Sequence, residues 1–69
     1  MTIPNQWICQ LHADGGKFYR REVRDGLVVV KRLKGERNWS VFHKGRFVRN
    51  DHATAREAME HVDEAEMYG

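Results

Sequence analysis

Apolar and polar residues alternate in short runs along the first fifty residues of the chain. In residues 6–11 every second position is apolar, at Trp7, Cys9 and Leu11, and this period of two indicates a strand with one buried face. Residues 17–23 are rich in aromatic and charged side chains and form a second predicted strand. The loop between these strands contains two adjacent glycines, which supply the positive φ that a tight reversal needs.

Three further strands are predicted around short turns. Residues 27–34 contain three successive valines, which favour a strand, and they follow Asp25-Gly26, a dipeptide typical of two-residue hairpin turns. Residues 38–43 and 46–49 complete the series, with a turn at Lys44-Gly45 between them. Since no connection exceeds about five residues, the strands are expected to pair as an antiparallel meander.

A helical period replaces the strand period near Thr54. Thr54 and Glu57 have the spacing of a capping box, in which each side chain accepts a hydrogen bond from the other residue's amide. Apolar residues then recur on one stripe, at Ala55, Ala58, Met59, Val62 and Ala65. The opposite face carries Glu57, Glu60 and Glu64, with Asp63 nearer the edge, and is expected to be solvated. The sequence therefore predicts a single α+β domain over residues 1–69, with a small antiparallel meander sheet of four to five strands packed on one C-terminal helix.

The composition narrows the class of protein. A chain of 69 residues allows one domain, and 41% hydrophobic with 32% charged residues is typical of a folded domain rather than a disordered one. No run of about 18 apolar residues is present, which argues against a transmembrane helix. The first residues lack a basic segment followed by an apolar one, and the chain has one cysteine, so we expect a cytoplasmic protein that has no disulfide and no membrane contact.

Candidate catalytic and metal-binding groups are sparse. Cys9 and His12 have a zinc-ligand spacing, but the chain offers one thiol and no second pair of ligands, so we expect Cys9 to be a buried, inert thiol and expect no metal. Trp7 and Trp39 are predicted core residues, and a stacking role for either ring is the alternative. No nucleophile has an evident activating base, and no glycine-rich phosphate loop is present. We therefore expect no enzymatic activity and no cofactor.

The net charge of +2 conceals an asymmetry along the chain. Residues 1–53 hold eleven Lys and Arg against five Asp and Glu, a net charge of +6. Residues 54–69 hold one against five, a net charge of −4. A basic sheet and an acidic helix favour different partners, and an anionic ligand is expected to avoid the helix and bind the sheet.

Basic side chains interleaved with aromatic ones predict a binding surface on the open face of the sheet. If Trp39 and Val41 face the helix, Phe42 lies on the open face, together with Tyr19 and several Lys and Arg. The predicted nucleic-acid-binding residues are Tyr19, Arg21, Arg32, Lys34, Phe42, Arg46 and Arg49. Such a surface suits phosphate contacts and base stacking. The alternative is a solvated or protein-binding face, because Lys and Arg also protect sheet edges against aggregation.

A family resemblance supports the nucleic-acid interpretation. Trp39-x-Val41 opens a strand, Lys44-Gly45-Arg46 turns it, and Thr54-x-x-Glu57-Ala58 opens a helix. In this pattern residues 30–68 resemble the arm-site-binding domains of tyrosine recombinases and the related APETALA-type DNA-binding domains. The resemblance implies a sheet laid in the DNA major groove, with Arg21, Arg32, Lys34, Arg46 and Arg49 contacting DNA. The short, β-rich chain is also similar to phage- or plasmid-encoded accessory proteins that dock on a host protein and inhibit or regulate it, and a protein partner is the alternative function.

Overall fold

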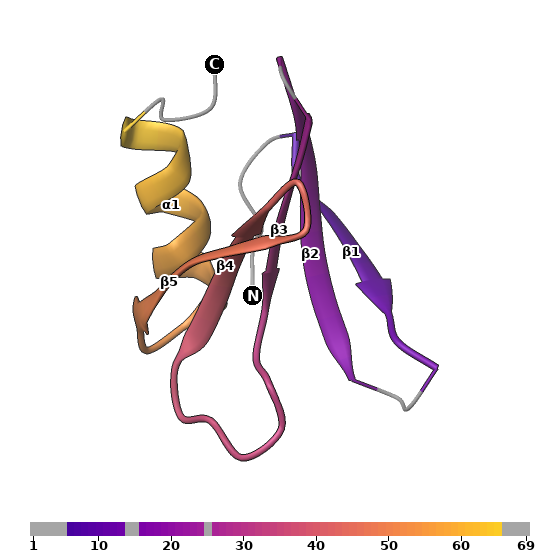
Figure 1. Cartoon of the computed structure of the whole chain (residues 1–69), viewed down its shortest axis with the longest axis vertical. Coiled ribbons are helices and arrows are strands. Elements are labelled where there is room, and N and C mark those ends of the chain that lie inside the picture. Colours follow the sequence, from indigo (N-terminus) through magenta and orange to yellow (C-terminus); the bar gives the residue numbers. More distant parts are fainter. Residues whose placement is uncertain (1–5, 14–15, 25, 66–69) are drawn as a thin grey trace.

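The computed structural model describes residues 6–13, 16–24 and 26–65. Five strands precede one helix: β1 (Ile8–Leu11), β2 (Lys17–Val23), β3 (Gly26–Lys31), β4 (Trp39–His43), β5 (Arg46–His52) and α1 (Ala55–Ala65). The strands form one antiparallel sheet in the order β1-β2-β3-β4-β5, and α1 packs against one side of it (Figure 1). This confirms the predicted α+β meander with a C-terminal helix.

Two tight turns meet at one end of the sheet. Lys44 and Gly45, between β4 and β5, have φ values of 54° and 77°, and a positive φ at both central residues is the signature of a type I′ turn. The Lys44 amide donates a hydrogen bond to the Leu27 carbonyl at 3.0 Å. Gly26 has a φ of 144°, and a Cβ there would lie 2.8 Å from Cγ of Lys44, so the turn between β2 and β3 requires glycine at this position. Asp25, the other residue of the predicted hairpin turn, lies outside the described residues.

The predicted end of the third strand is wrong. β3 stops at Lys31, which pairs with Ser40, so residues 32–38 form the connection to β4 instead of continuing the strand to residue 34. In this connection the Glu36 amide donates to the Leu33 carbonyl at 3.0 Å, and Gly35 has a φ of 85°. The turn reverses the chain earlier than the run of apolar residues suggested.

The helix begins where the capping box predicts. Oγ1 of Thr54 accepts a hydrogen bond from the Glu57 amide at 3.1 Å, and α1 starts one residue after Thr54. The apolar stripe is buried at Ala55, Ala58, Met59 and Val62. α1 lies over β3, β4 and β5, at the end of the sheet opposite β1 (Figure 1).

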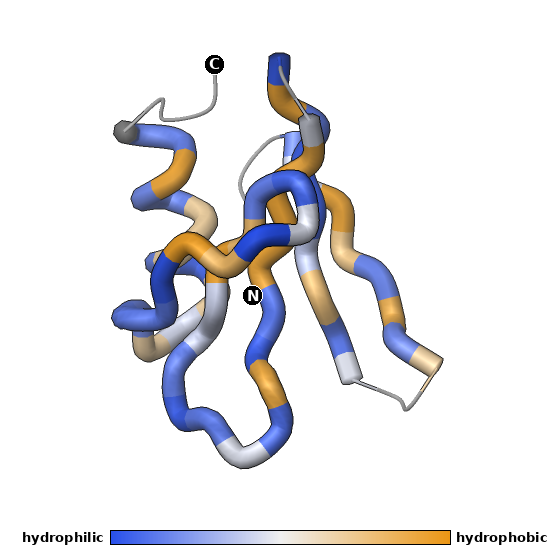
Figure 2. The backbone as a smooth tube through the Cα atoms, viewed as in Figure 1, coloured by the Kyte–Doolittle hydropathy of each residue, from blue (hydrophilic) through white to orange (hydrophobic). Residues whose placement is uncertain are grey.

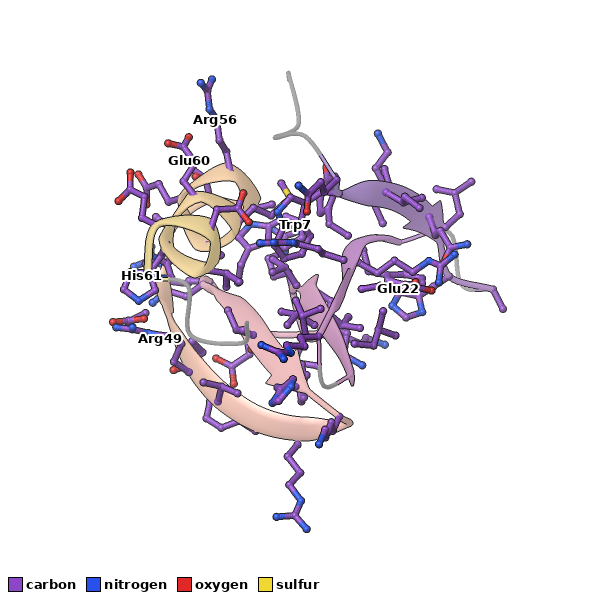
Figure 3. All side chains as sticks on the ribbon, turned by 90° about the horizontal axis from the view of Figure 1, so that it is seen from above. Trp7, Glu22, Arg49, Arg56, Glu60 and His61 are labelled. Atoms are coloured by element: carbon purple, nitrogen blue, oxygen red, sulfur yellow. The ribbon has the colours of Figure 1, made fainter. Side chains whose placement is uncertain are left out.

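The two faces of the sheet have different surroundings. The face against α1, which we call the covered face, buries Tyr19, Val28, Val30 and Val41. The hydrophobic stretch of β3 passes through the middle of the sheet (Figure 2). The other face, which we call the open face, carries the alternate residues of each strand. Trp7, just before β1, is also buried and lies between α1 and the sheet (Figure 3).

Burial of the first strand was predicted incorrectly beyond Trp7. Cys9 is exposed, and Leu11 retains 69% of its accessible surface, although both lie on the predicted apolar face of the strand. The reason is topological, because β1 is the edge strand farthest from α1 and the helix does not reach it. The expectation that the Cys9 thiol is buried is therefore wrong.

Candidate nucleic-acid interface

Tyr19 belongs to the core and not to the open face. It retains 7% of its accessible surface on the covered face, and its ring lies 5.9 Å from the ring of Trp39 in a tilted arrangement. Burial, together with the neighbouring Cys9 thiol, raises the pKa of the Tyr19 hydroxyl. The predicted placement of Tyr19 among exposed aromatic residues is wrong. Trp39 packs against the core as predicted.

Arg21 also points to the covered face, where it joins β2 to the helix. Its Nη1 donates to Oδ1 of Asp63 at 2.5 Å, and Nε1 of Trp7 donates to both oxygens of the same carboxylate at 3.0 and 3.1 Å. The carboxylate expected to be solvated at the edge of the helix is thus a shared acceptor for two other segments. Arg21 neutralises Asp63, so the prediction that it faces phosphate from the open face is wrong.

Arg49 is likewise held on the covered side. Its Nε and Nη2 donate to the two carboxylate oxygens of Asp51 at 2.7 and 2.5 Å, and this hydrogen bonding lowers the pKa of Asp51 to about 2. Its Nη1 lies 2.5 Å from Nε2 of His61 on α1, and Figure 3 shows the two side chains together. Because a guanidinium can only donate, Nε2 of His61 is the acceptor. Arg49 therefore connects β5 to α1, away from the open face.

The remaining predicted cations are exposed in two places. Arg32 and Lys34 lie in the connection after β3, directly beyond Lys31. Arg46 is the first residue of β5 and pairs with His43. Since Phe47 follows it on the open face, alternation directs Arg46 to the other side of the strand. The predicted place of Arg46 on the open face is therefore wrong, whereas Arg32 and Lys34 follow the open-face residue Lys31 in the connection to β4.

Phe42 is the centre of an aromatic cluster on the open face. It pairs with Phe47, whose ring meets it edge-on with centroids 5.8 Å apart. The ammonium of Lys31 lies over the Phe42 ring, 4.8 Å from its centroid. Phe42 is half-buried, whereas Phe47 keeps 55% of its surface, so a flat ring remains available to a ligand.

Several open-face residues were missed by the sequence analysis. The pairings Phe18 with Lys31 and Arg20 with Val29 place these side chains on the same face as Phe42. The sequence signal for these residues was the alternation of side chains along the valine run. Once Val28 and Val30 are assigned to the core, Lys31 must point to the open face with Val29. On β2 the same parity would have selected Phe18 and Arg20 over Tyr19 and Arg21.

Together these residues define what we call the aromatic–basic surface: Phe18, Arg20, Lys31, Phe42 and Phe47, with Arg32 and Lys34 beyond its edge. Guanidinium and ammonium groups can neutralise phosphates, and an exposed ring can stack on a base. Among the described residues, no three His, Cys, Asp or Glu side chains are grouped so as to hold a metal ion. The helix in this part of the chain is too short and too polar to cross a lipid bilayer.

Comparison with known proteins adds no further information on this surface. No protein-family model, no curated protein and no solved structure matches the chain.

Proposed function

We propose that this chain is a non-enzymatic DNA-binding module that binds nucleic acid with the aromatic–basic surface of its open face. The main support for the proposal is the cluster of Lys31, Phe42 and Phe47 on a face that α1 leaves uncovered. The Lys31 ammonium lies over the half-buried Phe42 ring, and the exposed Phe47 ring packs edge-on against Phe42. The resemblance to DNA-binding domains that use a sheet points the same way.

Each part of this surface has a distinct expected role. The exposed Phe47 ring offers a stacking platform that accepts any base. Lys31 and Arg20 flank the rings, and Arg32 and Lys34 extend the positive charge from the end of β3, where phosphates can be neutralised. The proposed interface does not include Tyr19, Arg21 or Arg49. Tyr19 is buried in the core, Arg21 is hydrogen-bonded to Asp63, and Arg49 is hydrogen-bonded to Asp51.

A protein-binding module is the second candidate function. It is favoured by exposed apolar side chains outside the core, Phe47, Ile8 and Leu33, which a protein partner could cover. Such a partner would be held mainly by apolar contact, with little salt dependence. Phosphate neutralisation instead weakens steeply as salt rises, so salt dependence separates the two functions.

The proposal is tested by fluorescence anisotropy with labelled single-stranded and duplex DNA, starting at about 50 mM salt, where phosphate contacts are strong. Phe47→Ala should weaken binding by about 5- to 150-fold, the range for loss of one stacked base. The double variant Arg32→Ala/Lys34→Ala should weaken binding and lower the salt slope by about two, one for each lost phosphate contact.

The matched control is Arg56→Ala. Arg56 carries the same charge but projects from the outer face of α1, where it pairs with Glu60 at 2.7 Å (Figure 3). Its loss should leave DNA affinity unchanged, and replacing Glu60 and Glu64 by Gln should leave affinity equal or slightly higher. If the parent protein binds neither form of DNA at low salt, or if Arg56→Ala weakens binding as much as the double variant, the DNA-binding proposal is overturned.

A further inference from the structure

The two edges of the sheet differ in how they are protected against pairing with another strand. β5 carries charged residues, its pairing with β4 shifts register on both sides of Val41, and α1 packs beside it. Charge, irregular pairing and a covering helix all discourage further strand addition. Among the described residues, β1 carries no charge, pairs with β2 in a regular register and has no helix packed beside it. Its four residues, Ile8-Cys9-Gln10-Leu11, are uncharged and all exposed.

The hydrogen bonding of the first hairpin shows which backbone groups face the free edge. The His12 amide donates to the Gly16 carbonyl at 2.7 Å, so this is a hydrogen-bonded pair of the antiparallel ladder. Such pairs alternate with non-hydrogen-bonded pairs, and the next non-hydrogen-bonded residues on β1 are Leu11 and Cys9, opposite Lys17 and Tyr19. The N–H and C=O groups of Cys9 and Leu11 therefore point away from β2, toward the free edge.

We propose that β1 pairs with β1 of a second copy of this chain in an antiparallel register centred on Gln10. A twofold axis perpendicular to the sheet keeps the covered faces of both copies on one side. Residues directly opposite each other in a sheet point to the same face. The twofold axis must therefore pass between two copies of the same residue, so that this residue lies opposite itself. When the pairing is centred on Gln10, Cys9 of each copy lies opposite Leu11 of the other. The N–H and C=O groups of Cys9 and Leu11 on each copy are then all paired with those of the other copy, which gives four hydrogen bonds.

A second copy fits this edge better than a charged strand does. β1 is neutral, so two copies meet without like-charge repulsion, and Ile8 and Leu11, exposed by 51% and 69%, gain apolar cover. α1 lies over β3 to β5 at the far end of the sheet and does not obstruct the seam (Figure 1). A seam of one short strand per copy is small, so the dimer is expected to be weak and concentration-dependent.

The dimer would form one continuous ten-stranded sheet, with both helices on one side and both open faces on the other. This arrangement follows from the twofold axis and does not depend on what the open face binds. If the open face binds DNA, the dimer doubles the length of the binding surface. The dimer itself is measured without DNA, so its failure and that of the proposed function are distinguishable.

Disulfide trapping tests the register directly. In the Gln10-centred pairing, Gln10 of one copy lies opposite Gln10 of the other as a non-hydrogen-bonded pair, with Cα atoms about 4.5 Å apart. That separation allows a disulfide, so the variant Cys9→Ser/Gln10→Cys should become a covalent dimer under mild oxidation. The natural Cys9 provides the matched control. Its two copies would be offset by two residues along the strand, with Cα atoms about 8 Å apart, too far for a disulfide.

The expected result is at least a tenfold faster cross-linking of the Gln10→Cys variant than of the parent, measured by mass spectrometry under non-reducing conditions. The parent should also show concentration-dependent dimerisation by sedimentation equilibrium, and Leu11→Lys should abolish it while circular dichroism remains native. Preferential cross-linking through Cys9, a monomer at all concentrations, or dimerisation unaffected by Leu11→Lys would each overturn the proposal.

Discussion

The covered and open faces of the sheet use the same residue types for different purposes, and adjacent arginines on β2 show the difference most clearly. Arg21 reaches the covered face and bonds the Asp63 carboxylate, which also accepts the Trp7 indole. Arg20, one residue earlier, lies on the open face opposite Val29 and has no such carboxylate partner among the described residues. Covered-face polar groups thus fix the helix on the sheet, whereas open-face polar groups remain available to a ligand.

The largest expected effect is on stability, and it comes from truncating one of two adjacent valines on β3 that point to opposite faces of the sheet. Val30→Ala removes two methyl groups from a wholly buried site and should lower the free energy of unfolding by about 2–3 kcal/mol. That loss is a large share of the total free energy of unfolding, which is expected to be about 3–10 kcal/mol for a domain of this size. Val29→Ala removes the same atoms from a half-buried site on the open face and should cost less than about 1 kcal/mol. Urea denaturation of both variants checks the comparison, and equal losses would contradict the assignment of faces.

A smaller difference is expected between the adjacent arginines of β2, Arg20 and Arg21. Arg21→Met should lower the free energy of unfolding by about 1–2 kcal/mol, because it removes a charge-assisted bond to a carboxylate that is only 30% exposed. DNA affinity should then change little beyond the loss of one distant charge. Arg20→Met should leave stability within about 0.5 kcal/mol and weaken DNA binding. Urea denaturation and anisotropy on the same two variants separate these outcomes, and a reversed pattern would contradict the proposed interface.

The order of elements was predictable from sequence, because local signals specify it. The Lys44-Gly45 turn, the Thr54 cap and the apolar stripe around Met59 each depend on residues a few positions apart. The assignment of side chains to faces was less predictable, because period-two alternation leaves two choices for each strand. On β2 the choice of Tyr19 as an outward residue was wrong, and the valine parity on the neighbouring strand could have corrected it.

Long-range partners were not predictable by the same reasoning. The Asp63 carboxylate meets Trp7 across 56 positions of sequence, and no local pattern links an edge residue of a helix to a tryptophan before the first strand. The exposure of Cys9 and Leu11 also depended on where α1 lies, because a helix that covered β1 would have buried both. Chain topology therefore determined which apolar residues became core.

The smallest expected effect concerns the buried hydroxyl of Ser40 on β4. Ser40 pairs with Lys31 and by parity belongs to the open face, yet it is fully buried, beside the register shift at Val41. Its Oγ has no hydrogen-bond partner within the part of the chain that the structure describes. Burying an unpaired hydroxyl is unfavourable, so Ser40→Ala should leave the free energy of unfolding unchanged or raise it by up to about 1 kcal/mol. DNA affinity should not change, because the side chain is inaccessible. Thermal and urea denaturation provide the measurement, and a loss of more than about 1 kcal/mol would show that the hydroxyl stabilises the strand through a bond of its own.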